Sequence, residues 1–217
     1  MAMGYREVPL EDLERIAIRD EELTEALPCL LRAPDVKEAL VLSTCNRVEV
    51  YAWVKDVEAA VDQTRLFLED LKQLPIGWTR TRTRLITGDD VIRHLFAVTA
   101  GLDSMVTGES EIQGQVRAAY KTATALGAVG PHLHGLFRWA LEAGKRTRTT
   151  TGLGRAKDSF PRAAVRAIDV TLRGVAGREV LVVGNGKMAA ASVRALTAAG
   201  AIRRTTRHFR QNERQRN

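Results

Sequence analysis

Residues 39–54, which read ALVLSTCNRVEVYAWV, decide the fold expected for the first part of this chain. The apolar run at 39–42 and the alternating, β-favouring residues at 48–54 predict two strands. The connection between them is short and polar, and it contains Cys45. We therefore expect the Cys45 thiol at a strand end rather than inside a hydrophobic core.

Helical patterns flank this strand pair on both sides. Apolar residues recur at helical spacing in each flanking segment, with charged residues between them. The expected elements are two short helices within 9–31, helices at 57–74, from 88 onward, at 109–126 and at 131–150, and one more strand at 79–87. This mixture of strands and helices predicts an α/β domain for residues 1–154.

A nucleotide-binding pattern follows a polar linker at 151–158. A helix is expected at 159–173, and GREVLVVG at 177–184 predicts a buried strand that turns into a helix ending near Gly200. The turn fits the Gly-x-Gly-x-x-Gly/Ala fingerprint, in which glycines let a pyrophosphate approach a helix N-terminus. The candidate cofactor-binding residues are Gly184, Asn185, Gly186, Lys187, Met188 and Ala189. A strand–helix turn without a ligand is the alternative interpretation.

The positive charge of the chain is concentrated at its end. The formal net charge is +7, and residues 201–217 contain six arginines and one glutamate. These residues lack the apolar run expected of a second buried strand. We therefore interpret 155–200 as the incomplete start of a Rossmann-type unit and 201–217 as a basic, disordered tail. A nucleic-acid-binding protein that uses this tail is one alternative function.

Several classes of protein are excluded by composition. No apolar run approaches the roughly 20 residues that span a bilayer, and residues 1–6 lack the apolar stretch of a signal peptide. The chain has two cysteines and no His/Cys cluster with zinc-ligand spacing. We expect a cytoplasmic protein with no membrane segment and no metal site.

Cys45 is a candidate nucleophile because Arg47 stands two residues away. A guanidinium close to a thiol favours the thiolate, which is the reactive form. Arg47 could instead, or also, bind a substrate carboxylate through two parallel hydrogen bonds. The alternative is that a lone cysteine is only a small hydrophobe, which is our interpretation of Cys29 in its apolar helix.

Two segments resemble the glutamyl-tRNA reductase family: STCNRVEVY at 43–51 and HLFAVTAGLDSMVTGESEIQGQV at 94–116. The resemblance implies a ferredoxin-like catalytic domain with long helices, in which Cys45 is the nucleophile and His94 lies near it. The pKa of a histidine suits proton transfer near neutrality, although by spacing alone His94 is an ordinary helix-face residue. The resemblance implies substrate-binding roles for Thr44, Asn46, Arg47, Ser104, Glu109, Ser110, Glu111 and Gln115.

One position departs from the family pattern, because Glu111 stands where relatives commonly have glutamine. Without the resemblance, Glu109 and Glu111 are ordinary acidic residues of a first helical turn.

The activity implied by the resemblance is an NADPH-dependent reduction. Glutamyl-tRNA would be converted to glutamate-1-semialdehyde through a thioester on Cys45, as the first step of tetrapyrrole (porphyrin) biosynthesis. Family members form homodimers, but we expect the dimerisation domain to be missing, since the sequence after Gly200 resembles a truncated or frameshifted end. Impaired activity is therefore expected, and a non-catalytic remnant that binds substrate or a partner is a second alternative.

Overall fold

A computed structural model describes residues 1–109, 111–153, 160–184 and 187–203. The chain divides into two compact units, Met1–Gly152 and Leu153–Asn217. The predicted boundary between 154 and 155 falls in residues outside the described ranges. Each unit is therefore considered by itself.

A three-stranded antiparallel sheet forms the centre of the first unit. Its strands are β1 (Ala2–Gly4), β2 (Val36–Ser43) and β3 (Arg47–Val54), in the order β1-β3-β2. On the other side of β1, Ala2 forms an isolated antiparallel bridge with Arg84. The predicted strand pair is confirmed, and it is a hairpin in which Val41 lies opposite Val50 and Leu42 opposite Glu49.

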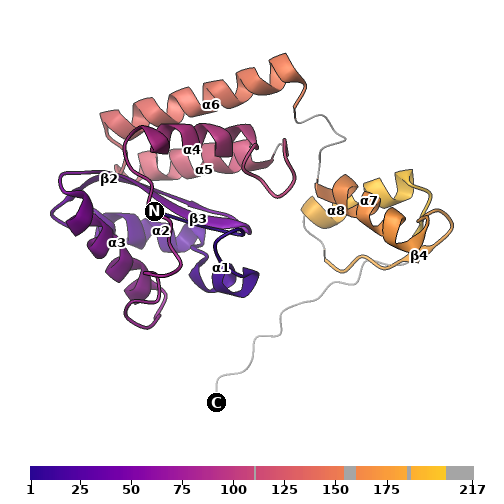
Figure 1. Cartoon of the computed structure of the whole chain (residues 1–217), viewed down its shortest axis with the longest axis horizontal. Helices are drawn as coiled ribbons and strands as arrows, with labels where there is room; N and C mark the ends of the chain where they lie inside the picture. The colour runs from indigo at the N-terminus through magenta and orange to yellow at the C-terminus, as the bar shows by residue number, and fades with distance from the viewer. Residues whose placement is uncertain (110, 154–159, 185–186, 204–217) are drawn as a thin grey trace. The chain divides into compact units, whose positions relative to one another are not determined.

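The helices of this unit, α1 to α6, lie on the two sides of the sheet (Figure 1). One side carries α1 (Leu10–Ile16), α2 (Asp20–Leu30) and α3 (Val57–Leu71), and the other carries α4 (Asp89–Ala100), α5 (Glu111–Ala125) and α6 (Pro131–Thr151). These are the helices that the apolar spacing predicts. Their ends follow ordinary capping chemistry: Asp56 accepts a hydrogen bond from the Ala59 amide at the start of α3, and α6 begins with Pro131.

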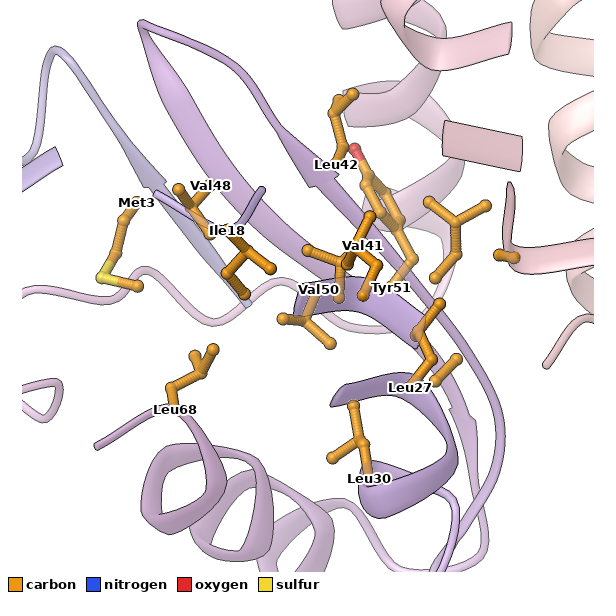
Figure 2. Packing of buried hydrophobic residues seen from close by; sticks show 14 of the residues in the cluster. Met3, Ile18, Leu27, Leu30, Val41, Leu42, Val48, Val50, Tyr51 and Leu68 are labelled. Carbon is orange, nitrogen blue, oxygen red and sulfur yellow. The ribbon is translucent and has the colours of Figure 1, made fainter. Parts of the chain in front are cut away.

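The alternation of residues along the hairpin supplies both layers of the core. Val41, Val48 and Val50 face Leu27, Leu30 and Leu68, whereas Leu42 and Tyr51 point to the opposite side (Figure 2). There the Tyr51 ring packs edge-on against Phe137 of α6, with ring centroids 5.2 Å apart. Successive side chains of a strand point to opposite faces, and both faces of this hairpin carry large apolar side chains. The hairpin therefore packs against both helical layers.

The predicted strand at 79–87 is wrong. Residues 76–82 form turns, and within the described part of 79–87 only Arg84 pairs with the sheet. The reason is the buried carboxylate of Glu69, which accepts hydrogen bonds from the amides of Gly77 and Thr79 and from the Thr79 hydroxyl at 2.9, 2.8 and 2.6 Å. These donors are therefore held by a helix side chain and do not enter a strand ladder.

The second unit contains α7 (Phe160–Leu172), β4 (Glu179–Val180), α8 (Lys187–Ala198) and β5 (Ile202–Arg203). The predicted buried strand at 177–184 is only two residues long, and Leu181 and Val183 are exposed. A strand after Gly200 was not expected, yet β5 pairs in parallel with β4. The Ile202 amide donates to the Arg178 carbonyl at 2.8 Å, so this pairing rests on the backbone and needs no apolar run. Within the described ranges, no helix is long and apolar enough to cross a membrane.

Candidate functional site

Cys45 lies at the tip of the β2–β3 hairpin. The Thr44 amide donates to the Arg47 carbonyl at 2.8 Å, which leaves Cys45 and Asn46 as the two tip residues. The Thr44 hydroxyl accepts hydrogen bonds from the Asn46 and Arg47 amides, both at 3.2 Å. Cys45 is exposed. The predicted position of the thiol, outside the core in the connection between two strands, is confirmed.

The hairpin tip is also bound to the N-terminal segment. The Tyr5 amide donates to the Asn46 carbonyl at 3.0 Å, and the Ile18 amide donates to the Ser43 hydroxyl at 2.9 Å. Both contacts flank Cys45 in the sequence. The tip is therefore held on two sides, which favours a fixed position for the thiol.

Arg47 points into the protein, where its side chain is only 4% exposed. Its guanidinium forms ion pairs with Glu49 at 2.9 Å and with the Asp103 carboxylate at 3.3 Å, and it also donates to the Asp103 carbonyl. Asp103 in turn pairs with Arg6 at 2.8 Å. Burial acts to lower the pKa of Arg47, but Glu49 and Asp103 outweigh it and hold this pKa above its usual range. A substrate carboxylate at Arg47 would thus compete with Asp103.

Glu49 is the centre of a buried hydrogen-bond network. One carboxylate oxygen contacts Arg47 and also His94 Nε2 at 3.0 Å, and the other accepts a hydrogen bond from the Tyr51 hydroxyl at 2.5 Å. Burial acts to raise the pKa of Glu49, but the hydrogen bond from His94 and the charge of Arg47 outweigh it, so the pKa is lowered. The same carboxylate adds to burial in raising the pKa of Tyr51.

The contacts of His94 assign its tautomer. Arg84 Nη2 lies 3.4 Å from His94 Nδ1, and a guanidinium can only donate. Nδ1 therefore accepts, and Nε2–H donates to Glu49. Within residues 1–109 and 111–153, the His94 ring contacts Glu49, Arg84 and Tyr51, and Cys45 is not among these partners. Since Glu49 lies two residues beyond Arg47 on β3, the Glu49–His94 pair is roughly 7 Å further from the hairpin tip than Arg47 is.

The electrostatic environment of Cys45 is acidic. The pKa of Cys45 is raised, first by the partial burial of its thiol and then by the charges of Glu109 and Glu111. The expectation that Arg47 favours the thiolate is therefore wrong for this arrangement, because its guanidinium is turned toward Glu49 and Asp103. Burial also raises the pKa of Glu109, and the charge of Glu111 adds to this effect. The two segments that the sequence singled out, 43–51 and 94–116, do come together around the thiol.

The other predicted substrate residues lie on the same side of the unit. Ser104 is buried, and its hydroxyl acts to lower the pKa of Glu109. Arg148 of α6 donates to the Glu109 carbonyl at 2.9 Å. Glu111 is exposed and Gln115 half-buried one turn later on α5, while Ser110 falls outside the described ranges.

The predicted nucleotide turn is described in part. Gly184 has a φ of 128°, a conformation that favours glycine, and α8 begins three residues later at Lys187. Met188 is exposed and Ala189 half-buried, whereas Asn185 and Gly186 lie outside the described ranges.

The interpretation of Cys29 as a small buried hydrophobe is wrong, since Cys29 is exposed. The buried residues of α2 are Leu23, Ala26, Leu27 and Leu30, so Cys29 lies beside the apolar stripe rather than in it. Both thiols of the chain thus reach solvent.

Sequence reasoning missed Glu49, Tyr51 and Asp103 as members of the network. The first two could have been found, because residues 47, 49 and 51 share one face of a strand. Asp103 is joined to Arg47 across 56 positions of sequence, and no local pattern indicates that contact.

Comparisons with known proteins agree on one family. Residues 1–151 match the family described as glutamyl-tRNAGlu reductase, N-terminal domain. The chain is 35% identical over 201 residues to glutamyl-tRNA reductase of Crocosphaera subtropica, covering 93% of this chain and 47% of that protein. It is 41% identical over 209 residues to glutamyl-tRNA reductase 2 of a Nocardioides species, covering 93% and 45%.

A solved structure is similar as well. Glutamyl-tRNA reductase from Methanopyrus kandleri superposes with a TM-score of 0.62 at 32% identity, over 94% of this chain and 48% of that one. The chain therefore spans about half the length of the relatives that it matches.

Proposed function

The chain belongs to the glutamyl-tRNA reductase family, and on that premise we propose that Cys45 receives the glutamyl group of glutamyl-tRNA as a thioester. The observation that carries this proposal is the exposed Cys45 thiol on a fixed hairpin tip, with Glu109 and Glu111 close enough to influence its pKa. The Cys45 sulfur attacks the ester carbonyl carbon, the bond to the ribose oxygen breaks, and that oxygen takes up the proton that the thiol loses.

The acidic surroundings of Cys45 suit a substrate that carries a positive charge next to its ester. An aminoacyl ester carries an α-ammonium group, which fits beside Glu109 and Glu111. The bound cation would offset the two carboxylates that now raise the pKa of Cys45. The thiol would then become more nucleophilic when the correct substrate is present. Thr44, Asn46, Ser104, Ser110 and Gln115 complete the proposed pocket.

Arg47 and His94 have distinct proposed roles. Arg47 binds the glutamyl carboxylate in place of Asp103, to which it is bound at 3.3 Å. His94 would exchange a proton with the bound substrate from the side of Glu49 rather than directly with Cys45, and Glu49 holds its ring in one orientation through the bond to Nε2. Both roles depend on the network around Glu49.

The reduction requires a hydride, which NADPH would supply. We propose that Gly184 to Ala189 hold its pyrophosphate, because the φ of Gly184 and the start of α8 fit the fingerprint turn. On this hypothesis the β4–α8–β5 segment is the start of a Rossmann-type unit. We also infer a ferredoxin-like arrangement for the first unit. The strands lie in the order β1-β3-β2, and Arg84 pairs with the free side of β1. This order matches that of an antiparallel ferredoxin-like sheet in which the Arg84 bridge takes the place of the fourth strand.

The test separates acyl transfer from reduction. Glutamyl-tRNA with a radiolabelled glutamyl group is incubated with the 217-residue chain, with and without NADPH, and acid-stable protein label, free glutamate and semialdehyde are measured. Cys45→Ser is expected to abolish thioester labelling, whereas Cys29→Ser, which changes the other exposed thiol, is expected to preserve it. Equal labelling of the wild type and Cys45→Ser would refute the proposal, and tRNA binding without any label would favour a binding function.

A further inference from the structure

The positive charge of the first unit is concentrated in two helices, α5 and α6. Residues 1–110 contain 13 lysines and arginines against 20 aspartates and glutamates, whereas residues 111–151 contain six lysines and arginines against two glutamates. The two signs of charge are thus separated within one compact unit. A face on which one sign of charge gathers produces a potential that attracts ligands of the opposite sign.

Two side-chain contacts set the register between α5 and α6, which lie side by side (Figure 1). The Gln113 side chain of α5 donates to the Leu141 carbonyl of α6 at 2.9 Å. Seven residues later on α5, the Tyr120 hydroxyl lies 2.6 Å from Nδ1 of His134, which is seven residues earlier on α6. The two helices are therefore antiparallel, and the residues midway between these contacts lie opposite each other.

Arg117 and Arg138 are the residues midway between the two contacts. Each lies one helical turn from both contact residues of its own helix, so the two arginines face each other across the interface of α5 and α6. Both are exposed, and neither forms an ion pair with the residues that the structure describes. Two such cations repel each other, and an anion bound between them would replace this repulsion by attraction.

Three more cations extend this pair along both helices. Lys121 lies one turn beyond Arg117 on α5, and Lys145 and Arg146 lie two turns beyond Arg138 on α6. All three are exposed and form no ion pair within the described ranges. The sole acidic residue of α6 is Glu142, which is exposed as well. We call the five cations the α5–α6 basic face: Arg117, Lys121, Arg138, Lys145 and Arg146.

An exposed tryptophan accompanies the basic face. Trp139 follows Arg138 on α6 and is 66% exposed. Proteins that bind single-stranded nucleic acid combine cations, which contact the phosphates, with aromatic rings on which the bases stack. A site for small anions has no use for an exposed indole ring. The basic face and Trp139 together therefore favour a nucleic acid over an isolated phosphate.

The basic face begins close to the proposed acyl-transfer site. Glu111, whose charge acts on Cys45, is the first residue of α5. Arg117 is six residues later, which places it about 9 Å further along the helix. Arg148 donates to the Glu109 carbonyl, so the C-terminal part of α6 lies at the same end of the face. An RNA whose 3′ ester reaches Cys45 would place its preceding phosphates along these two helices.

We propose that the α5–α6 basic face binds the phosphates of the single-stranded 3′ end of the substrate tRNA, with one base stacked on Trp139. The inference rests on the proposed function, which supplies the identity of the RNA. Single-stranded ends suit this face because their bases are free to stack on a side chain. The arginines of residues 201–217 are not required for this binding.

The experiment measures fluorescence anisotropy of 5′-labelled, uncharged glutamate tRNA titrated with the 217-residue chain at several salt concentrations. Arg117→Gln combined with Arg138→Gln is expected to weaken binding about tenfold or more at low salt. It should also reduce the slope of log Kd against log salt concentration by about two, one for each lost phosphate contact. Arg117→Lys combined with Arg138→Lys keeps both charges and should keep the slope. Trp139→Ala should weaken binding about fivefold or more without changing the slope, whereas Trp139→Phe should retain stacking.

Arg207→Gln combined with Arg210→Gln is the matched control, because it removes the same charge from the end of the chain. It is expected to leave the affinity nearly unchanged. Equal losses of affinity in the two double variants would overturn the proposal, as would a salt slope that the change at Arg117 and Arg138 does not alter. A dimer that dissociates in that variant and binds no tRNA would assign the face to a second copy instead.

A second substrate separates this inference from acyl transfer. The glutamyl ester of adenosine carries the same ester but no phosphate. The variant changed to glutamine at Arg117 and Arg138 is expected to form thioester from this ester as the wild type does, but less from glutamyl-tRNA below saturation. Cys45→Ser is expected to bind uncharged tRNA normally and to form no thioester. Loss of tRNA binding in the arginine variant, with no thioester formed by the wild type, would refute the proposed function and still support the basic face.

Discussion

Replacing Glu49 by glutamine is expected to destabilise the first unit by about 3 kcal/mol, the cost of removing one partner from a buried ion pair. Glu49 is 2% exposed and its two oxygens receive bonds from Arg47, His94 and Tyr51. A glutamine has the same shape but only one acceptor oxygen, and its NH₂ group would face donors. Arg47 would keep its charge while losing one of its two carboxylate partners.

The assay is urea unfolding at neutral pH followed by tryptophan fluorescence. All three tryptophans, Trp53, Trp78 and Trp139, lie in the first unit, so the signal reports on that unit alone. Asp90→Asn is the control. It breaks the Arg93–Asp90 pair, whose side chains are 74% and 75% exposed, and an exposed pair contributes about 0.5 kcal/mol or less.

The loss should depend on pH in a defined direction. The pKa of Glu49 is lower in the folded protein than its usual value of about 4.3. Its stabilising effect is therefore fully present above the unfolded pKa and is lost as pH falls through the lower, folded pKa. The difference between wild type and Glu49→Gln should shrink in that acidic window. Equal stability losses for Glu49→Gln and Asp90→Asn at neutral pH would refute the argument that the Glu49 network holds β3 to α4.

Two further predictions concern the thiol and the helix packing. Glu109→Gln should accelerate alkylation of Cys45 by iodoacetamide severalfold at neutral pH, because it removes a charge that raises the pKa of Cys45. The alkylation rate of Cys29 should stay the same. Both rates are measured by peptide mass spectrometry, and unchanged labelling of both thiols would contradict this prediction. Gly144→Ala should destabilise the first unit by about 1–3 kcal/mol in urea unfolding, because an added Cβ would lie 3.0 Å from Thr99 of α4. Gly135→Ala, on the same helix with open space around it, should instead stabilise by about 0.5–1 kcal/mol, and equal effects of the two changes would exclude close α4–α6 packing as the cause.

The features of the candidate site that depend on local sequence pattern were predictable. The position of Cys45 follows from the strand pair around it, and the family motifs indicate which segments meet. The surroundings of the thiol were not predictable, since the sequence places Arg47 next to Cys45 while the structure turns its guanidinium to Glu49 and Asp103. Neighbours along a strand point to opposite faces, so closeness in sequence does not imply contact between side chains.

The period of the apolar residues along the chain was enough to predict the hairpin and the helices from α1 to α8, because each helix or strand must turn its apolar side toward the core. Contacts between distant segments of the chain could be identified only in the folded structure. Glu69 of α3 takes the amides of Gly77 and Thr79 and prevents the strand that alternation favoured there. Backbone pairing alone forms β5, and Arg47 meets Asp103 across 56 residues. Periodicity specifies the face on which a residue lies, whereas the partner on the opposing surface is set by how the elements pack.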